Sequence, residues 1–280
     1  MKTCRRATVV LVCLLACVLP LSAQTTDSSS DSQPSQPTSS SSASPTYGGD
    51  RLYLQFIRDA AIIPHQWWEG RVVFTDAESI DATVADFVVA LQPINKVEVG
   101  GRIGFGTTST SEGLPDGSGA TDLQVWGKWA GVMGESQKTE FAFGGELGVP
   151  TGDDTAGLGT DSWNLAVFAA FRQPLSFAVL SWNAGFRFND DGSIVGVPLT
   201  GEASGFLGGA ILWPISDQFT FVGELDYESA RFEGIDGDLR ILGGVNWRPF
   251  NTGVLRGAVS AGLTDGAPNA QLFLGYAYTF

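Results

Sequence analysis

The sequence has 280 residues, of which 43% are hydrophobic, and its 30 acidic residues outnumber the 16 basic ones to give a net charge of −14. Such an acidic chain is unsuited to nucleic acid, because phosphates are bound by Lys and Arg. All three cysteines lie within the first 17 residues. The rest of the chain therefore offers neither a disulfide framework nor a thiolate site.

Residues 1–23 predict a secretory signal peptide. Three basic residues precede an almost wholly apolar run, and the small residue Ala23 ends it. Two alternatives stay open. The run holds roughly 17 apolar residues, marginally enough for a membrane-anchoring helix, and the stretch 14–17 resembles a lipoprotein cleavage box in which Cys17 would be lipidated. Cleavage after Ala23 leaves 13 basic residues against 30 acidic ones, a net charge of −17.

Residues 24–46 are rich in Ser, Pro, Thr and Gln and contain no large apolar side chain. Such a segment cannot offset its ordering entropy by burial, so it predicts a disordered linker. Residues 47–66 form a separate N-terminal segment. Within it Leu52, Phe56, Ile57 and Ala60 have helical spacing, which predicts a short helix tucked in or under the following domain. A strand extension fits the same residues.

Residues 67–280 alternate between strand patterns of period two and turn signals. Twelve candidate strands of about 10–13 residues can be counted, a length that suits tilted membrane-spanning strands better than the usual strands of soluble proteins. Short connections containing Pro alternate with longer ones rich in Gly, Asp and Ser. Short turns on one side and long loops on the other are typical of an antiparallel, up-and-down outer-membrane β-barrel.

Most of these strands carry their charges on one face only. In the strand around residue 100, Val97, Val99, Ile103 and Phe105 share one side, whereas charged residues occupy the other. Alternation alone would also suit a soluble sandwich. The apolar faces, however, place an aromatic residue just before several short turns, which predicts an interfacial aromatic belt. Its members are Trp129, Phe171, Trp213 and Trp247.

The charged faces are predicted to point into the lumen of the barrel. The lumen-lining candidates are Glu69, Arg71, Glu98, Arg102, Lys128, Glu146, Arg172, Arg187, Glu224, Arg240, Arg248 and Arg256. These residues could form a structural salt-bridge network that fills the barrel, or a polar conduit that sets the field for a permeating ion. Twelve strands enclose more space than side chains fill in an eight-stranded barrel, so a narrow, partly plugged passage fits both interpretations.

The last residues, 272–280, place large apolar side chains at every second position. This pattern predicts a final strand that pairs with the first one, so that no sheet edge is exposed in lipid. Alternating aromatic residues that end in Phe resemble the signal that bacterial outer-membrane proteins present to the barrel-assembly machinery. The residues that carry this insertion signal are Tyr276, Tyr278 and Phe280.

A closer resemblance lies in residues 141–171, where an apolar strand ends in Pro150–Asp153 and a Gly-rich loop leads into the next strand. The stretch resembles the putative transporter family named after the meta-pathway of phenol degradation, and residues 94–106 resemble the second hairpin of that family. The family usually has a Gly-Asp pair before its fourth strand, whereas here Gly119 and Asp122 are separated by two residues. The resemblance implies passage of small apolar or aromatic molecules.

Other classes of function are disfavoured. The sequence contains a single histidine, His65, which leaves little scope for a nucleophile with a histidine base, and we expect no enzyme, no catalytic residue and no cofactor. Asp153, Asp154 and Asp161 share a loop but lack the spacing of a calcium loop, so we expect no metal site.

The sequence thus predicts an outer-membrane channel or transporter of a Gram-negative bacterium, with the N-terminal segment in the periplasm. The alternative is a structural or surface barrel that transports nothing. Expected partners are outer-membrane lipid, the barrel-assembly machinery and a small-molecule substrate, whose identity the sequence does not determine.

Overall fold

The computed structural model describes residues 54–62, 66–78, 80–110, 116–133, 139–250 and 253–280. The chain divides into two compact units, Met1–Ser44 and Pro45–Phe280. The first unit and residues 45–53 lie outside the described residues, and with them the predicted signal peptide, the whole predicted linker and Leu52 of the predicted short helix. Within the described residues, no helix has the length and apolar character needed to cross a membrane.

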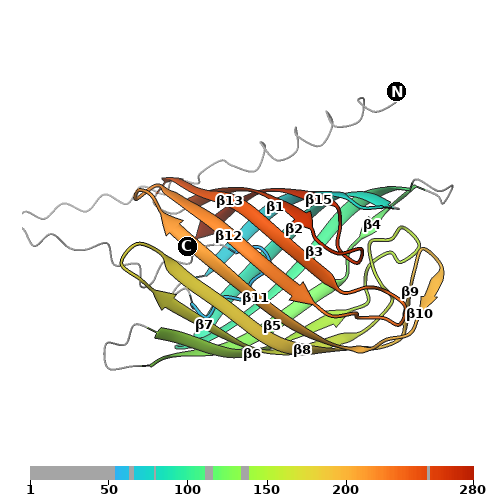
Figure 1. The fold of residues 1–280 in the computed structure, drawn as a ribbon, viewed down its shortest axis with the longest axis horizontal. Coiled ribbons are helices and arrows are strands. Elements are labelled where there is room, and N and C mark those ends of the chain that lie inside the picture. Colours follow the sequence, from blue (N-terminus) through green and yellow to red (C-terminus); the bar gives the residue numbers. More distant parts are fainter. Residues whose placement is uncertain (1–53, 63–65, 79, 111–115, 134–138, 251–252) are drawn as a thin grey trace, which may run out of the picture. The chain divides into compact units, whose positions relative to one another are not determined.

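Twelve strands of the second unit form one closed antiparallel barrel, in which they run obliquely around the wall (Figure 1). The predicted fold class and strand number are therefore confirmed. In chain order the strands are β1 (Trp67–Asp76), β2 (Ile80–Ile94), β3 (Val97–Thr110), β5 (Leu123–Met133), β6 (Thr139–Val149), β7 (Asn164–Pro174), β8 (Val179–Asn189), β11 (Ala203–Pro214), β12 (Phe219–Glu228), β13 (Asp238–Phe250), β14 (Gly253–Gly262) and β15 (Ala270–Thr279).

The barrel closes between its first and last strands, as the sequence predicts. β1 pairs with β15 from Trp67 opposite Thr279 to Asp76 opposite Ala270. Beyond the last pair, the main-chain N–H of Phe280 donates to the carbonyl of Gln66 at 2.9 Å. Because every long strand has two neighbours, the twelve-stranded wall has no free edge, which is the condition for a β-structure in lipid.

Three short strands lie in segments that the sequence predicts as loops. β4 (Gly117–Ala120) pairs with β3 from Phe105 to Thr108, while β5 pairs with β3 from Val97 to Arg102. β9 (Gly192–Ile194) and β10 (Val197–Leu199) form a separate hairpin. Val195 and Gly196 both have positive φ, at 51° and 75°, which matches the tight two-residue turn that joins antiparallel strands.

The hydrophobic pattern of the wall is the reverse of that in a soluble protein. Outward-facing residues are large and apolar, and many are strongly exposed, for example Phe105 at 61% and Phe186 at 64%. Inward-facing residues include many buried charged groups, among them Arg172 at 0% and Glu98 at 2%. A soluble sandwich would bury the apolar face, so this arrangement fits a wall that is surrounded by acyl chains.

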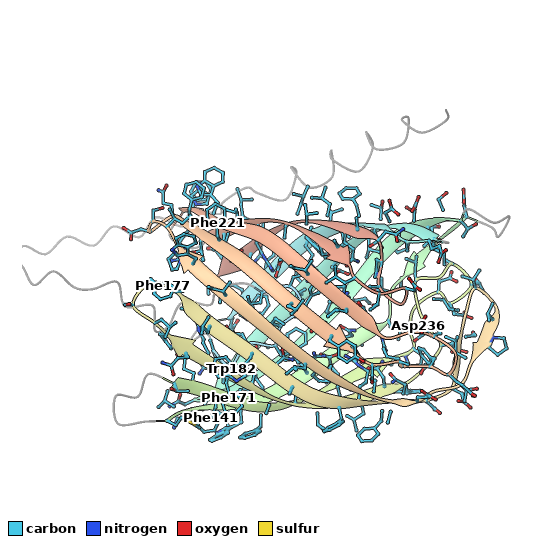
Figure 2. The ribbon with its side chains drawn as sticks, viewed as in Figure 1. Phe141, Phe171, Phe177, Trp182, Phe221 and Asp236 are labelled. Atoms are coloured by element: carbon cyan, nitrogen blue, oxygen red, sulfur yellow. The ribbon has the colours of Figure 1, made fainter. Side chains whose placement is uncertain are left out.

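Aromatic side chains gather on the outer face near the short turns. Figure 2 labels Phe141, Phe171, Phe177 and Trp182 toward this end of the barrel and Asp236 toward the opposite end. The rings of Phe171 and Trp182 stack with centroids 6.1 Å apart, and other stacked or edge-on pairs join Phe219 to Trp247, Trp129 to Phe141, and Tyr278 to Phe280. Three of the four residues predicted for the belt, Trp129, Phe171 and Trp247, take part in these contacts. The fourth, Trp213, lies opposite Phe221 on β12.

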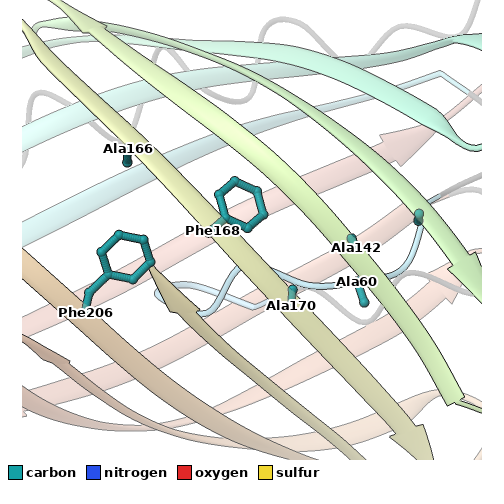
Figure 3. Packing of buried hydrophobic residues seen from close by; sticks show 7 residues of the cluster. Ala60, Ala142, Ala166, Phe168, Ala170 and Phe206 are labelled. Carbon is teal, nitrogen blue, oxygen red and sulfur yellow. The ribbon is translucent and has the colours of Figure 1, made fainter. Parts of the chain in front are cut away.

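Residues 54–62 are neither helix nor strand, and they run along the inside of the barrel as a bent chain (Figure 3). The short helix predicted for this region does not form there, and neither does a strand extension. The reason is that the wall supplies the hydrogen bonds that a helix would make internally. We call residues 54–62 the inner segment.

Candidate site inside the barrel

Glu224 on β12 holds the beginning of the inner segment. Its Oε1 accepts a hydrogen bond from the main-chain N–H of Gln55 at 2.7 Å, and its Oε2 accepts from Phe56 at 2.7 Å and from Ile57 at 3.2 Å. Three successive N–H groups therefore converge on one carboxyl group. Such convergence replaces the water that an extended chain would otherwise need, because unpaired buried main-chain groups are costly.

Arg58 extends from the inner segment toward three strands of the wall, β6, β7 and β11. Its Nη2 donates to both carboxylate oxygens of Glu146 on β6, at 3.2 and 3.3 Å. Its guanidinium carbon lies 4.3 Å from the ring centroid of Phe206 and 5.6 Å from that of Phe168. The arginine is thus held by charge on one side and by cation–π contact on the other.

The end of the inner segment is anchored by two wall cations. Arg172 Nη1 donates to Asp59 Oδ2 at 3.3 Å, and Lys128 Nζ donates to the carbonyls of Asp59 and Ala61 at 2.9 and 2.7 Å. Ser181 adds a hydrogen bond to Asp59 Oδ1 at 3.3 Å. The carboxyl group and the carbonyls of the segment are therefore satisfied by side chains of β5, β7 and β8.

Small residues on the wall make room for the inner segment. Ala60 packs with Ala142, Ala166 and Ala170 on β6 and β7, next to Phe168 and Phe206, and every member of this cluster is buried (Figure 3). At Gly208 on β11, an added Cβ would lie only 2.3 Å from Ile57 Cδ1. The inner segment consequently fits inside the barrel because the wall carries Ala and Gly at the positions that it contacts.

The predicted lumen-lining residues lie on inward positions of the wall, and most are buried. Buried candidates are Glu69, Arg71, Glu98, Lys128, Arg172, Arg187 and Glu224, while Arg102, Glu146, Arg240, Arg248 and Arg256 are partly exposed. Five of them contact the inner segment, namely Arg71, Lys128, Glu146, Arg172 and Glu224. A sixth, Arg240, lies 4.2 Å from the ring centroid of Phe56.

Ion pairs join many of these residues across neighbouring strands. Arg71 stands directly opposite Asp86 and pairs with it at 2.9 Å, and Glu98 stands opposite Lys128 and pairs with it at 3.3 Å. Further pairs join Arg187 to Glu146 and Glu228, Arg240 to Asp226 and Asp238, and Arg256 to Glu69. The ion pairs satisfy buried charges that would otherwise be expensive.

A cavity of about 450 Å³ lies beside the inner segment within the barrel. This volume falls in the range of small-molecule sites, roughly 300–1,000 Å³. The lining combines residues 54–59 of the segment with charged groups of β1, β3, β6 and β12 and with an apolar portion. The apolar portion consists of Trp67, Val73, Val84, Val88, Trp126, Phe168 and Phe273.

Several lining residues were not among the sequence candidates. Asp86 on β2 and Asp226 on β12 could have been found, because each has the inward parity of its strand. Arg58 and Asp59 could not, since no strand parity applies to an irregular segment. Arg231, in the loop between β12 and β13, is likewise placed only by the tertiary fold.

The long loop after β6 folds back against β3, β4 and β5. Asp122 accepts hydrogen bonds from the main-chain N–H of Gly152 at 2.9 Å and of Thr160 at 3.0 Å. In return Asp153 donates its main-chain N–H to Ala120, and an added Cβ on Gly119 would lie 2.5 Å from the Asp153 Cβ. Gly119 and Asp122, which are separated by two residues in the sequence, therefore each contact the turn at residues 150–153.

Asp153 has its own local contacts. It accepts a hydrogen bond from the Thr155 hydroxyl at 2.7 Å and from the main-chain N–H of Ala156 at 3.0 Å, and these bonds lower the pKa of its carboxyl group. Across the described residues, no group of three or more His, Cys, Asp or Glu side chains is arranged to hold a metal ion. His65 lies outside the described residues.

The fold is similar to several solved outer-membrane barrels. The COG4313 outer membrane channel from Pseudomonas putida F1 matches with a TM-score of 0.68 and 14% identity, over 82% of this chain and 100% of that chain. KdgM porin matches with a TM-score of 0.54 and 11% identity, over 76% and 99%. NanC porin matches with a TM-score of 0.56 and 10% identity, over 76% and 100%.

These identities are low, so the similarity shows the fold, which is that of outer-membrane β-barrels. No family model matches the chain, and no curated protein matches it. None of these three structures is named for the phenol meta-pathway, so the resemblance of residues 141–171 to that family stays a prediction.

Proposed function

We propose that this protein is a channel or transporter of the bacterial outer membrane that passes small molecules through its barrel. The observation that carries the proposal is the cavity of about 450 Å³ beside the inner segment. An eight-stranded barrel is filled by its own side chains, whereas twelve strands enclose more space. That space is taken here by nine residues of chain and by a cavity with both charged and apolar walls.

In this proposal the inner segment narrows the route and moves during passage. It is held by hydrogen bonds and ion pairs to Glu224, Glu146, Arg172 and Lys128, all of which can be exchanged for water. A segment held mainly in this way can leave without exposing a large apolar core. The lumen-lining charges then set the field that a permeating molecule meets.

The permeant class proposed here is small and apolar or aromatic. The resemblance of residues 141–171 implies it, and the Val, Trp and Phe side chains of the cavity wall are compatible with it. The proposed orientation places the short turns and Gln66, where the N-terminal segment joins β1, on the periplasmic side, the long loops outside, and lipid around the apolar face. Residues 54–62 of that segment, which the sequence predicts in the periplasm, lie inside the barrel instead. Tyr276, Tyr278 and Phe280 would act as the signal for the barrel-assembly machinery.

Liposome swelling and planar-bilayer conductance test the proposal. Refolded protein without residues 54–62 is expected to pass ions and small solutes at a rate several-fold above that of the intact protein. The matched control removes nine residues, 30–38, from the Ser-rich linker and should behave like the intact protein. Heat-modifiable gel mobility shows whether each variant is a folded barrel.

A second candidate is a structural barrel that transports nothing, and the dense anchoring of the inner segment favours it. No conductance from either the intact protein or the folded variant without residues 54–62 would support that candidate and contradict a channel. We expect no enzymatic activity, because the sequence contains a single histidine to serve as a general base.

A further inference from the structure

Two cations that line the cavity share their carboxylate with a second, closer cation. Seven carboxylates line it: Asp59, Glu69, Asp86, Glu98, Glu146, Asp226 and Glu228. Each has a cation within 3.4 Å, and the partners are, in the same order, Arg172, Arg256, Arg71, Lys128, Arg58, Arg240 and Arg187. Arg102 and Arg231 are the lining cations that remain after this pairing.

Arg102 on β3 reaches only an acceptor that is already occupied. Its Nε lies 3.7 Å from Asp86 Oδ2, the oxygen that Arg71 holds at 2.9 Å. That distance exceeds a hydrogen bond, and the Arg102 side chain stays 36% exposed inside the barrel. In the part of the chain that the structure describes, the Arg102 Nε is buried without a hydrogen-bond partner, and the side chain lines the cavity.

Arg231 repeats this situation from the loop between β12 and β13. Its Nε lies 3.9 Å from Glu228 Oε1, which Arg187 holds at 2.8 Å, and 3.4 Å from Asn189 Oδ1. The Arg231 side chain is also 36% exposed. In both cases the nearest carboxylate is held more closely by another arginine, so Arg102 and Arg231 keep donors that this carboxylate does not use.

An apolar surface lies next to Arg102. On the paired strands β3 and β5, Arg102 stands opposite Gln124, and Gly100 stands opposite Trp126, so Arg102 and Trp126 are diagonal neighbours on the inner face. The Trp126 ring lies across Gly100, because an added Cβ there would come within 2.2 Å of the ring. Val84 and Val88 on β2 continue this apolar portion of the lining.

We propose that the cavity binds a small monocarboxylate with an apolar body. The carboxylate is held by the guanidinium of Arg102, whose fork geometry suits two parallel hydrogen bonds. The body lies against Trp126 and the neighbouring valines, and Arg231 attracts the anion from the long-loop end. A neutral molecule of the same shape lacks the ionic contact and leaves the Arg102 donors unpaired.

Calorimetric titration of the refolded mature protein in detergent tests the site with benzoate as the probe. Benzyl alcohol is its neutral counterpart, and acetate is the carboxylate without an apolar body. Wild-type protein is expected to bind benzoate saturably and at least 10-fold more tightly than either of the other two. Equal affinity for benzoate and benzyl alcohol would overturn carboxylate recognition, and equal affinity for acetate would overturn the apolar contact.

Variants locate the site. Arg102→Gln should weaken benzoate binding at least 10-fold, and Arg231→Gln should weaken it by a smaller factor. Arg248→Gln is the matched control, because Arg248 has the same inward parity on β13 but does not line the cavity. Unchanged benzoate affinity in folded Arg102→Gln would refute the assignment. If Arg102→Gln does not fold, two results together refute it: unchanged benzoate affinity in Arg231→Gln, and equal affinity of the wild type for benzoate and benzyl alcohol.

The role of this site in passage rests on the proposed channel function, but binding is measured without transport. Saturable benzoate binding without conductance would leave the site standing and remove the channel. Conductance without benzoate binding would leave the channel standing and remove the site.

Discussion

Glu224 accepts a hydrogen bond at 2.7 Å from the main-chain N–H of Phe56, a residue 168 positions earlier in the chain. One wall carboxyl group thereby fixes the start of a segment that lies inside the barrel. The two flanking N–H groups of Gln55 and Ile57 donate to the same group. This contact links the barrel wall directly to the segment that narrows its lumen.

Glu224→Gln is expected to loosen the inner segment without unfolding the barrel. An amide supplies one acceptor oxygen instead of two and turns an NH2 group toward main-chain N–H donors. A buried donor left without an acceptor costs about 1–3 kcal/mol, so the segment should be released roughly 5- to 150-fold more often. Single-channel recording would show this as more frequent high-conductance events.

Glu69→Gln serves as the control for this change. Glu69 pairs with Arg256 at 2.7 Å, and its carboxylate is not among the groups that anchor the described residues of the inner segment. The frequency of high-conductance events in this variant should follow that of the wild type. Similar opening frequencies in Glu224→Gln and in the wild type would show that Glu224 does not control the segment.

Gly208→Leu is expected to expel the inner segment by steric conflict. An added Cβ would lie 2.3 Å from Ile57 Cδ1 and 2.9 Å from Asp226 Oδ1, so the larger side chain has no room while Ile57 stays in place. Protease cleavage within residues 54–62 should become several-fold faster in the folded protein. Gly209→Leu is the neighbouring control, because an added Cβ there meets nothing within 4 Å and should leave the cleavage rate unchanged.

Val99→Arg is expected to destabilise the barrel in lipid. Val99 is 39% exposed on the outer face of β3, and an arginine near the bilayer midplane costs roughly 2–4 kcal/mol. Unfolding of the protein in lipid vesicles by denaturant measures this free energy. Val99→Leu keeps the apolar character and should unfold like the wild type. Equal stabilities of Val99→Arg and Val99→Leu would contradict the assignment of this face to lipid.

The Asp153 carboxyl group is expected to titrate below the usual range of aspartate. The Thr155 hydroxyl and the main-chain N–H of Ala156 stabilise its charged form and lower its pKa. Because the pKa is lower in the folded state, the charged Asp153 carboxylate adds to the stability of the folded protein. This stabilisation is present above the ordinary aspartate pKa, about 3.9, and is lost as the pH falls through the pKa of Asp153 in the folded state.

An NMR titration of Asp153 checks this expectation. Thr155→Val should raise the pKa toward the ordinary range, because it removes the strongest of the bonds. Thr151→Val is the control, since the Thr151 hydroxyl accepts from Leu123 and does not contact Asp153. A pKa of Asp153 that stays unchanged in Thr155→Val would show that the hydroxyl is not its cause.

The architecture of the wall was largely predictable from the sequence. A residue pattern of period two states which side chains share a face, so alternation alone separates Val99, Ile103 and Phe105 from the charged residues of the same strand. The pairing of the last strand with the first also followed, because a barrel in lipid cannot leave an edge unpaired. The first inference depends only on local periodicity, which a single strand contains in full. The second adds the requirement that no edge stays unpaired in lipid.

The outer loops and the lumen were less predictable. The hairpin of β9 and β10 depends on positive φ at Val195, a conformation that β-branched residues rarely adopt and that no local signal announces. The partner of each inward charge depends on which strand lies beside it and in which register. Parity places Arg71 inside the barrel, but only the register between β1 and β2 sets it opposite Asp86.

The sequence by itself determined the twelve strands, their two faces and the alternation of short and long connections, because these follow from short-range alternation and turn chemistry. Only the tertiary structure decided that residues 54–62 lie inside the barrel as an irregular chain and that Arg102 and Arg231 remain as spare cations beside a cavity. The physical reason is that an irregular segment takes its hydrogen bonds from the wall around it. Those partners, such as Glu224 for Phe56, are distant in sequence and become neighbours when the barrel closes.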